Sequence, residues 1–104
     1  MQNHPAPAYW PEVVQVVPTK DYHLYVYFND GSVHLFDARP LIKAGTVFEP
    51  LQDPAVFCGC ATVMHQTAAW DLTGERDPRR SIDLDPFVLY EQAAVPDPLA
   101  DLGA

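Results

Sequence analysis

A pair of alternating segments between Tyr22 and Phe36 constrains the fold more than any other feature of the sequence. They flank the turn-forming residues 29–32, which include Asp30 and Gly31, the dipeptide preferred in a type I′ turn. Within each segment, side chains of two kinds alternate with the period of a β-strand. The sequence therefore predicts an antiparallel hairpin whose two-residue loop is Asp30-Gly31.

This loop sets the pairing of the two strands, with Phe28 opposite Val33 and Tyr27 opposite His34, and opposed residues share a face of the sheet. One predicted face is apolar and suits a core: Leu24, Val26, Phe28, Val33 and Leu35. The other combines rings with polar groups: His23, Tyr25, Tyr27, His34 and Phe36. Two interpretations of this second face stay open. It binds another protein or subunit, as aromatic surfaces often do, or the last helix covers it within the monomer.

Other strands are predicted from short apolar runs. Residues 13–17 are a valine-rich run that ends at Pro18, which is typical of a first strand. Residues 58–65 and 67–70 are expected to form two more strands around a turn at His65. Residues 71–80 are predicted to be a polar loop.

Three aspartates indicate helix starts, two of them because a proline follows directly. Asp37 precedes one or two predicted helical turns at 40–45, and Asp53 precedes a single turn at 55–57, with a loop at 46–52 between them. Asp85 precedes an amphipathic helix that we expect to reach Ala94, because apolar residues recur there at helical spacing.

Taken together, these elements predict an α+β fold in a small single domain, with an antiparallel sheet of about five strands, short helices and a C-terminal helix. The 104 residues allow one domain. We assign residues 1–11 to a flexible proline-rich leader, 12–95 to the domain and 96–104 to a polar tail.

The charge balance narrows the range of partners. Six Lys and Arg residues face 14 Asp and Glu residues, giving a net charge of −8. The longest basic run is Arg79-Arg80, so direct nucleic-acid binding is not expected. No signal peptide and no membrane-spanning apolar stretch is evident in the sequence, which favours the cytoplasm and no membrane association.

From Val13 to Glu91 the sequence resembles the bacterial family called domain of unknown function 2442. The resemblance depends on the order and spacing of several motifs: residues 22–28, Asp30-Gly31, Phe36-Asp37, residues 40–42, residues 48–53, Phe57, residues 69–71, residues 74–77, residues 82–86 and residues 89–91. It implies a small α+β fold with an antiparallel sheet and supplies no catalytic residues. It also implies similarity in setting to free-standing proteins, domains joined to a helix-turn-helix, and partners in toxin–antitoxin-like gene pairs.

Two clusters in the sequence contain metal-ligand types. Cys58, Cys60 and His65 offer three soft ligands, but zinc sites commonly use four, so two reduced thiols are the preferred interpretation. Five carboxylates lie within 15 residues: Asp71, Glu75, Asp77, Asp83 and Asp85. Calcium takes such ligands, yet the EF-hand spacing is absent. Helix capping and local pairing of Asp77 with a nearby arginine are preferred instead.

The aromatic residues Trp70 and Tyr90 are expected to pack in the core rather than to stack on a ligand. No catalytic constellation and no cofactor motif is identified. We therefore expect a non-enzymatic interaction module, antitoxin-like or adaptor, that binds a protein partner or self-associates. The candidate interaction residues are Tyr25, Tyr27, His34, Phe36, Trp70, Asp71, Asp77 and Asp83. The alternative is a small metal-binding protein or enzyme centred on Cys58, Cys60 and His65 or on the Asp71–Asp85 loop.

Overall fold

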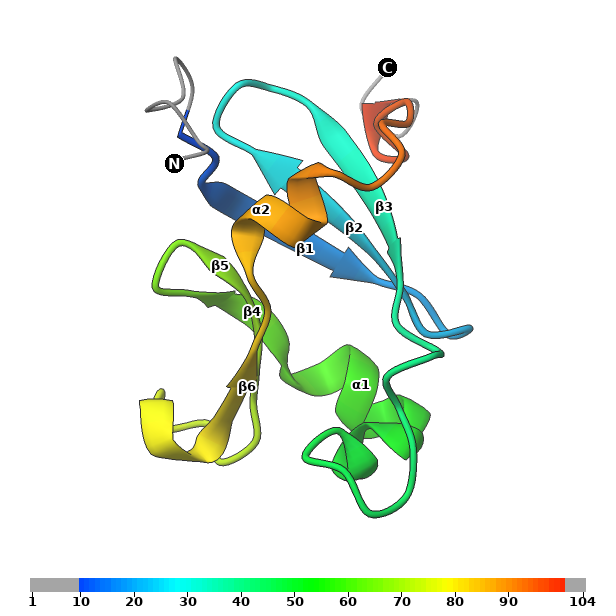
Figure 1. Cartoon of the computed structure of the whole chain (residues 1–104), viewed down its shortest axis with the longest axis vertical. Helices are drawn as coiled ribbons and strands as arrows, with labels where there is room; N and C mark the ends of the chain where they lie inside the picture. The colour runs from blue at the N-terminus through cyan, green and yellow to red at the C-terminus, as the bar shows by residue number, and fades with distance from the viewer. Residues whose placement is uncertain (1–9, 101–104) are drawn as a thin grey trace, which may run out of the picture.

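Two three-stranded antiparallel sheets form the framework of the protein in a computed structural model that describes residues 10–100 (Figure 1). The first sheet contains β1 (Val13–Pro18), β2 (His23–Phe28) and β3 (Val33–Asp37) in that order. The second contains β4 (Ala61–Met64), β5 (Thr67–Asp71) and β6 (Ser81–Asp83). The helices are α1 (Pro54–Cys60) and α2 (Pro86–Tyr90), with short 3-10 helices η1 (Glu49–Gln52) and η2 (Pro78–Arg80). The α+β class is confirmed, but the expected sheet of about five strands is two sheets of three.

Parts of the predicted leader and tail, residues 1–9 and 101–104, lie outside the described residues. Within residues 10–100, no helix is long and apolar enough to cross a membrane. At the start of the described chain Pro11 is buried, and the backbone N–H of Glu12 donates to Asn29 Oδ1 at 3.2 Å. Pro11, which the prediction assigned to the leader, is therefore packed against the domain.

The hairpin is confirmed, but its register differs by one residue from the prediction. Tyr27 pairs with Val33, and Val26 pairs with His34. The loop has three residues rather than two, because the Phe28 N–H donates to Ser32 O at 3.0 Å and the Gly31 N–H donates to Phe28 O at 3.0 Å. Gly31 has a φ of 87°, the left-handed conformation that closes a three-residue hairpin loop.

The shifted register turns every β3 side chain to the opposite face. His34 and Phe36 lie on the buried face beside Val26 and Leu24, with only 6% and 8% of their surfaces exposed. Val33 and Leu35 lie on the other face beside the half-buried Tyr27 and Tyr25, although Val33 is still buried there, with 5% of its surface exposed. The predicted aromatic face is therefore wrong as a unit, because its four interaction candidates are divided between the two sides of the sheet.

The chain after α2 covers the free edge of β3 (Figure 1). The Leu35 N–H donates to Ala93 O at 3.0 Å, and the Val95 N–H donates to Val33 O at 2.8 Å. Further along, the Tyr27 hydroxyl donates to Asp97 Oδ1 at 2.6 Å. The last helix thus ends at Tyr90 instead of continuing to residue 94, and the extended segment that follows it makes these contacts.

The helix starts are confirmed at two of the three predicted positions. The side chains of Asp53 and Asp85 each accept a hydrogen bond from the backbone N–H two residues later, as N-caps do. The helix after Asp53 is longer than expected and includes Cys58 and Cys60, so the following strand begins only at Ala61.

Three other segments differ from the prediction. Residues 40–45 form turns rather than a helix, although Asp37 accepts from the Arg39 N–H at 3.0 Å in the same way as the two N-caps. Residues 49–52, expected as loop, form η1. Strand β6 at residues 81–83 was not predicted.

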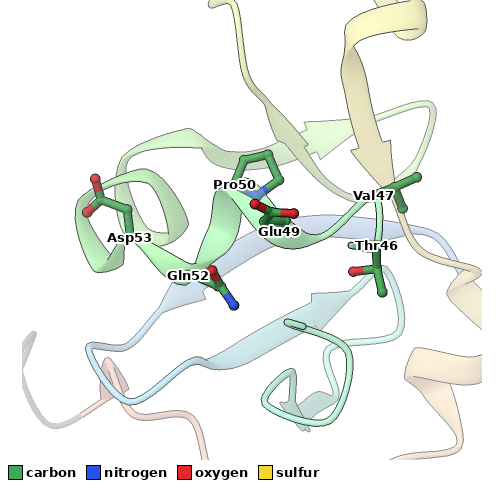
Figure 2. A pocket seen from close by; sticks show the side chains of 6 residues that line it. All are labelled: Thr46, Val47, Glu49, Pro50, Gln52 and Asp53. Atoms are coloured by element: carbon green, nitrogen blue, oxygen red, sulfur yellow. The ribbon is translucent and has the colours of Figure 1, made fainter. Parts of the chain in front are cut away.

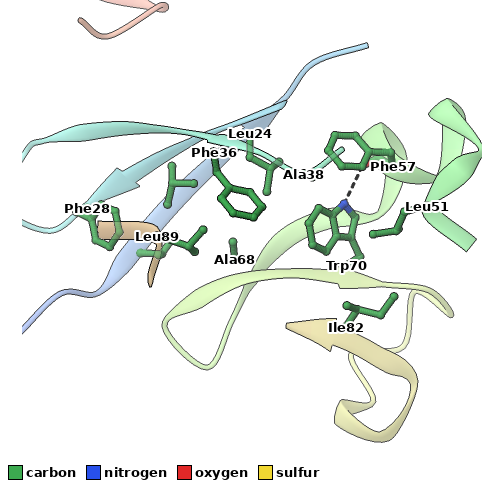
Figure 3. Close-up of a cluster of buried hydrophobic side chains, with 12 residues drawn as sticks. Leu24, Phe28, Phe36, Ala38, Leu51, Phe57, Ala68, Trp70, Ile82 and Leu89 are labelled. Carbon is green, nitrogen blue, oxygen red and sulfur yellow. Dashed lines mark hydrogen bonds between the residues drawn. The ribbon is translucent and has the colours of Figure 1, made fainter. Parts of the chain in front are cut away.

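The core fills the space between the two sheets and the helices (Figure 3). Trp70 and Phe57 are almost fully buried, with their ring centroids 5.4 Å apart. The Trp70 Nε1–H donates to the backbone oxygen of Phe57 at 3.0 Å, so the polar atom of the indole is satisfied. The prediction that Trp70 is a core residue is confirmed, and Trp70 is therefore not available as an interaction residue.

Candidate functional site

An apolar groove of about 380 Å³ lies where the end of β3, the loop before η1 and the start of α2 meet. Its lining is mostly aliphatic and aromatic: Phe36, Asp37, Pro40, Leu41, Phe48, Leu84, Asp85, Val88 and Leu89. Ligand sites commonly have volumes of about 300–1,000 Å³ and apolar walls with a few polar groups. The groove is at the small end of that range.

Local sequence signals determine how α2 forms one wall of this groove. Asp85 Oδ1 accepts from the Phe87 N–H at 2.9 Å, and Pro86 takes the first helical position. Just before the helix, the Leu84 N–H donates to Ala68 O at 3.1 Å, which ties the helix start to β5. The helix then places Leu89 at the fully buried floor of the groove and leaves Val88 45% exposed at its edge.

Two carboxylates stand in the groove lining, and they differ in how they are paired. Asp37 binds Arg39 through both oxygens, with Oδ1 2.9 Å from Nε and Oδ2 2.7 Å from Nη2. Hydrogen bonds from the Arg39 side chain and then its backbone lower the pKa of Asp37 to about 2. By contrast, the one hydrogen bond of the Asp85 side chain within residues 10–100 comes from a backbone N–H, and no cation there pairs with it.

Large apolar side chains are exposed next to the groove. We use the name α2 surface for Trp10, Phe87 and Val88, of which 60%, 39% and 45% are exposed. The Trp10 and Phe87 rings meet edge to face with centroids 5.4 Å apart. Exposed apolar residues in contact with one another are typical of interaction sites, whereas single exposed ones are ordinary.

A polar cluster joins the hairpin to α2 on the buried side of β3. Asp30 Oδ1 accepts from the Ser32 hydroxyl at 2.6 Å, and Asp30 Oδ2 accepts from the Tyr90 hydroxyl at 2.7 Å. These bonds, those from Ser32 above all, lower the pKa of Asp30. His34 completes the cluster, with Nε2 3.0 Å from Ser32 Oγ and Nδ1 2.8 Å from Gln92 O.

Ser32 and His34 together have the residue types of a nucleophile and its base, but the hydrogen bonds are arranged differently. In a serine nucleophile the hydroxyl proton points to the histidine. Here the Ser32 hydroxyl donates to Asp30 at 2.6 Å, and the Ser32 oxygen lies 3.0 Å from His34 Nε2. The cluster therefore connects the hairpin to α2 and to the segment that follows it.

The acidic candidates from the second half of the chain are engaged mainly in turns. The Asp71 carboxylate accepts from the N–H groups of Gly74 at 3.1 Å and Arg76 at 2.9 Å. Asp77 caps η2 and pairs with Arg79 at 3.4 Å, which confirms its predicted local role. Asp83 ends β6 with its side chain exposed. These carboxylates do not converge on a common point among the described residues.

The soft-ligand candidates are not brought together either. Cys58 and Cys60 are free thiols in α1, and Cys58 Sγ lies 3.5 Å from the backbone oxygen of Thr19. His65 is exposed in the β4–β5 turn with a φ of 52°. Across the described part of the chain, no three His, Cys, Asp or Glu side chains are grouped as metal ligands.

A second opening surrounds η1, with a volume of about 540 Å³ (Figure 2). Its carboxylates are already used by the local backbone: Glu49 Oε1 accepts from the Gly45 N–H at 2.8 Å, and Asp53 Oδ1 accepts from the Ala55 N–H at 2.9 Å. Figure 2 shows Asp53 and Val47 at opposite ends of this opening. The groove beside α2 is more apolar and better defined, so it is the stronger candidate site.

Sequence reasoning did not identify the groove. Its apolar walls come from residues 36–48 and 84–89, which are far apart in the chain and meet only after folding. The one local signal was the predicted helix start at Asp85, which correctly located the wall formed by α2.

The comparisons with known proteins establish a family without an assigned activity. No curated protein and no solved structure matches the chain. A family model described as a protein of unknown function, DUF2442, matches residues 13–95, which include both sheets, both helices and the whole lining of the groove. On that match, the chain belongs to the DUF2442 family.

Proposed function

We propose that this protein is a non-enzymatic interaction module, an adaptor or antitoxin-like subunit, that binds a partner protein through the α2 surface. The observation that carries the proposal is the contact between Trp10 and Phe87, with Val88 beside it on the same helix, all substantially exposed. Interface cores are rich in such aromatic and aliphatic side chains.

The charge of the protein supports a basic partner. The net charge is −8, and Asp83, Asp85 and Glu91 are exposed before, at the start of and after α2. An acidic surface of this kind steers positively charged proteins toward it and repels acidic ones. A second copy of the chain carries the same net charge, so self-association through this surface is disfavoured at low salt.

A binding role also agrees with the state of the polar groups. The Ser32 hydroxyl donates to Asp30, and the Asp71 and Asp77 carboxylates accept backbone hydrogen bonds. Groups occupied in this way hold turns and elements together. Such structural roles support a binding module rather than an enzyme.

The test is capture of the product of the adjacent gene by purified protein. We expect the native chain to capture that product, Val88→Glu to lose it, and the matched control Val14→Glu to retain it. Val14 is 59% exposed on β1, so both substitutions add one negative charge at an exposed valine. Equal capture by both variants, with circular dichroism and melting temperature unchanged, would contradict the α2 surface as the binding site.

A further inference from the structure

We propose that the groove beside α2 receives one large apolar side chain of a partner segment, and that a Lys or Arg of the same segment binds Asp85. This inference rests on the proposed function, because the groove adjoins the α2 surface and shares Val88 with it. Beyond the proposed function, it specifies which side chains the partner segment carries: one large apolar residue and one Lys or Arg.

The volume and lining of the groove define the apolar part of the ligand. About 380 Å³ is enclosed mainly by Phe36, Leu41, Phe48, Leu84, Val88 and Leu89. A site at the low end of the ligand range suits one or two side chains rather than a large cofactor. Leu89 and Phe36 are buried at its floor, so an entering side chain meets apolar surface that is already held in place.

The carboxylates define the charged part of the ligand. Both oxygens of Asp37 are held by Arg39, so its charge is compensated within the protein. Asp85 uses Oδ1 for the Phe87 N–H and, among the described residues, has no cationic partner. A positive group next to the apolar side chain therefore meets Asp85 and not Asp37.

A segment of a second copy is the competing occupant. Val47 is 72% exposed and lies four residues after Lys43, so this loop carries an apolar and a basic side chain close together. However, two copies that each carry a net charge of −8 repel one another. We therefore assign the groove to a basic segment of a different protein.

The experiment is a two-dimensional amide NMR titration of the full chain with three synthetic nine-residue peptides. All three consist of Ser and Gly except at two positions that are two residues apart. The first peptide has Leu and Lys at these positions, the second has Leu and Glu, and the third has Ala and Lys. We expect the Leu/Lys peptide to shift the amides of residues 36–41 and 84–89. The Glu peptide should bind about two- to fivefold more weakly, as an exposed ion pair contributes little. The Ala peptide should bind at least about tenfold more weakly, because a buried leucine contributes strongly.

Two matched pairs of variants separate the two parts of the proposal. Asp85→Asn keeps a good N-cap but removes the charge, and Asp83→Asn removes a charge outside the groove. Only Asp85→Asn should reduce the preference for Lys over Glu. Val88→Trp fills the groove mouth and should abolish the shifts, whereas Val14→Trp should not.

Each unfavourable outcome has a defined meaning. No shift in the groove amides with any peptide overturns the pocket, and equal effects of Asp85→Asn and Asp83→Asn overturn the ion pair. Concentration-dependent shifts of the same amides without peptide, together with dimers in sedimentation, overturn the assignment to a different protein. If Val88→Glu abolishes capture while no peptide binds, the proposed function stands and this inference fails. If the Leu/Lys peptide binds in the groove while Val88→Glu leaves capture unchanged, the groove has the proposed ligand chemistry and the proposed function fails.

Discussion

The Nδ1 atom of His34 lies 2.8 Å from the backbone oxygen of Gln92, so a side chain of β3 holds the segment that follows α2. A carbonyl oxygen accepts only, so His34 carries a hydrogen on Nδ1. The ring also packs against Tyr90, with centroids 4.7 Å apart. Through this pair of contacts the hairpin holds the C-terminal end of α2, and α2 forms one wall of the groove.

The bond from Tyr90 to Asp30 should contribute measurably to stability. Tyr90→Phe removes a hydroxyl that donates to a carboxylate at 2.7 Å. We expect a loss of about 1 kcal/mol in the free energy of unfolding, because hydrogen bonds to charged groups contribute somewhat more than neutral ones and this one is partly exposed. Urea denaturation followed by circular dichroism measures it. Tyr25→Phe is the control, and equal stability of the two variants would contradict the prediction.

The ion pair between Asp37 and Arg39 should make stability depend on pH in the acidic range. The pKa of Asp37 falls from 3.8 to about 2 in the folded protein, because Arg39 donates to it. The folded state therefore binds this proton less readily than the unfolded state, and the stabilisation is complete above about pH 4 and lost as the pH falls toward 2.

Asp37→Asn tests this prediction through melting temperatures between pH 7 and pH 2. At pH 7 the variant should melt below the native protein, and the difference should shrink steadily from pH 4 downward. A difference that stays constant across that range would show that the carboxylate charge is not the source of the effect.

The N-cap at Asp85 should tolerate asparagine but not alanine. Asp85→Ala leaves the Phe87 N–H without its acceptor and should cost about 1 kcal/mol, whereas Asp85→Asn should be nearly neutral. Chemical denaturation of both variants measures the difference. Equal losses would mean that the charge, rather than the cap, holds the start of α2.

Two glycines should respond to alanine with opposite signs. Gly31 has a φ of 87° in the hairpin loop, so Gly31→Ala should destabilise by about 1 kcal/mol. Gly59 lies within α1, and an added Cβ there meets no atom within 4 Å. Gly59→Ala should therefore stabilise by about 0.5–1 kcal/mol. Thermal unfolding of the pair gives the sign directly, and a stabilised Gly31→Ala would contradict the three-residue loop.

Structural features that depend on neighbouring residues were predictable from the sequence. Asp53 and Asp85 followed by proline located both helix starts, and the valine-rich run located β1, because capping and β propensity act within a few residues. Asp30-Gly31 located the hairpin. The same dipeptide predicted a two-residue loop, and the structure has a three-residue loop closed by Gly31.

Features that depend on distant segments were not predictable in this way. The one-residue change in register buries His34, whose two ring nitrogens face Ser32 and Gln92, a partner 58 residues away. The segment after Tyr90 leaves the helix because its backbone pairs with β3 instead. The groove likewise needs β3 and α2 in place before it exists.

The pairing of residues 93–95 with β3 has a consequence for the order of folding. The hairpin involves residues close together in the chain, so it can form early in folding. The free edge of β3, however, pairs with a segment some 60 residues later in the chain. Until that segment arrives, β3 is an unpaired strand edge, which is a template for association between chains. Loss of residues 93–104 would therefore favour aggregation over monomeric unfolding.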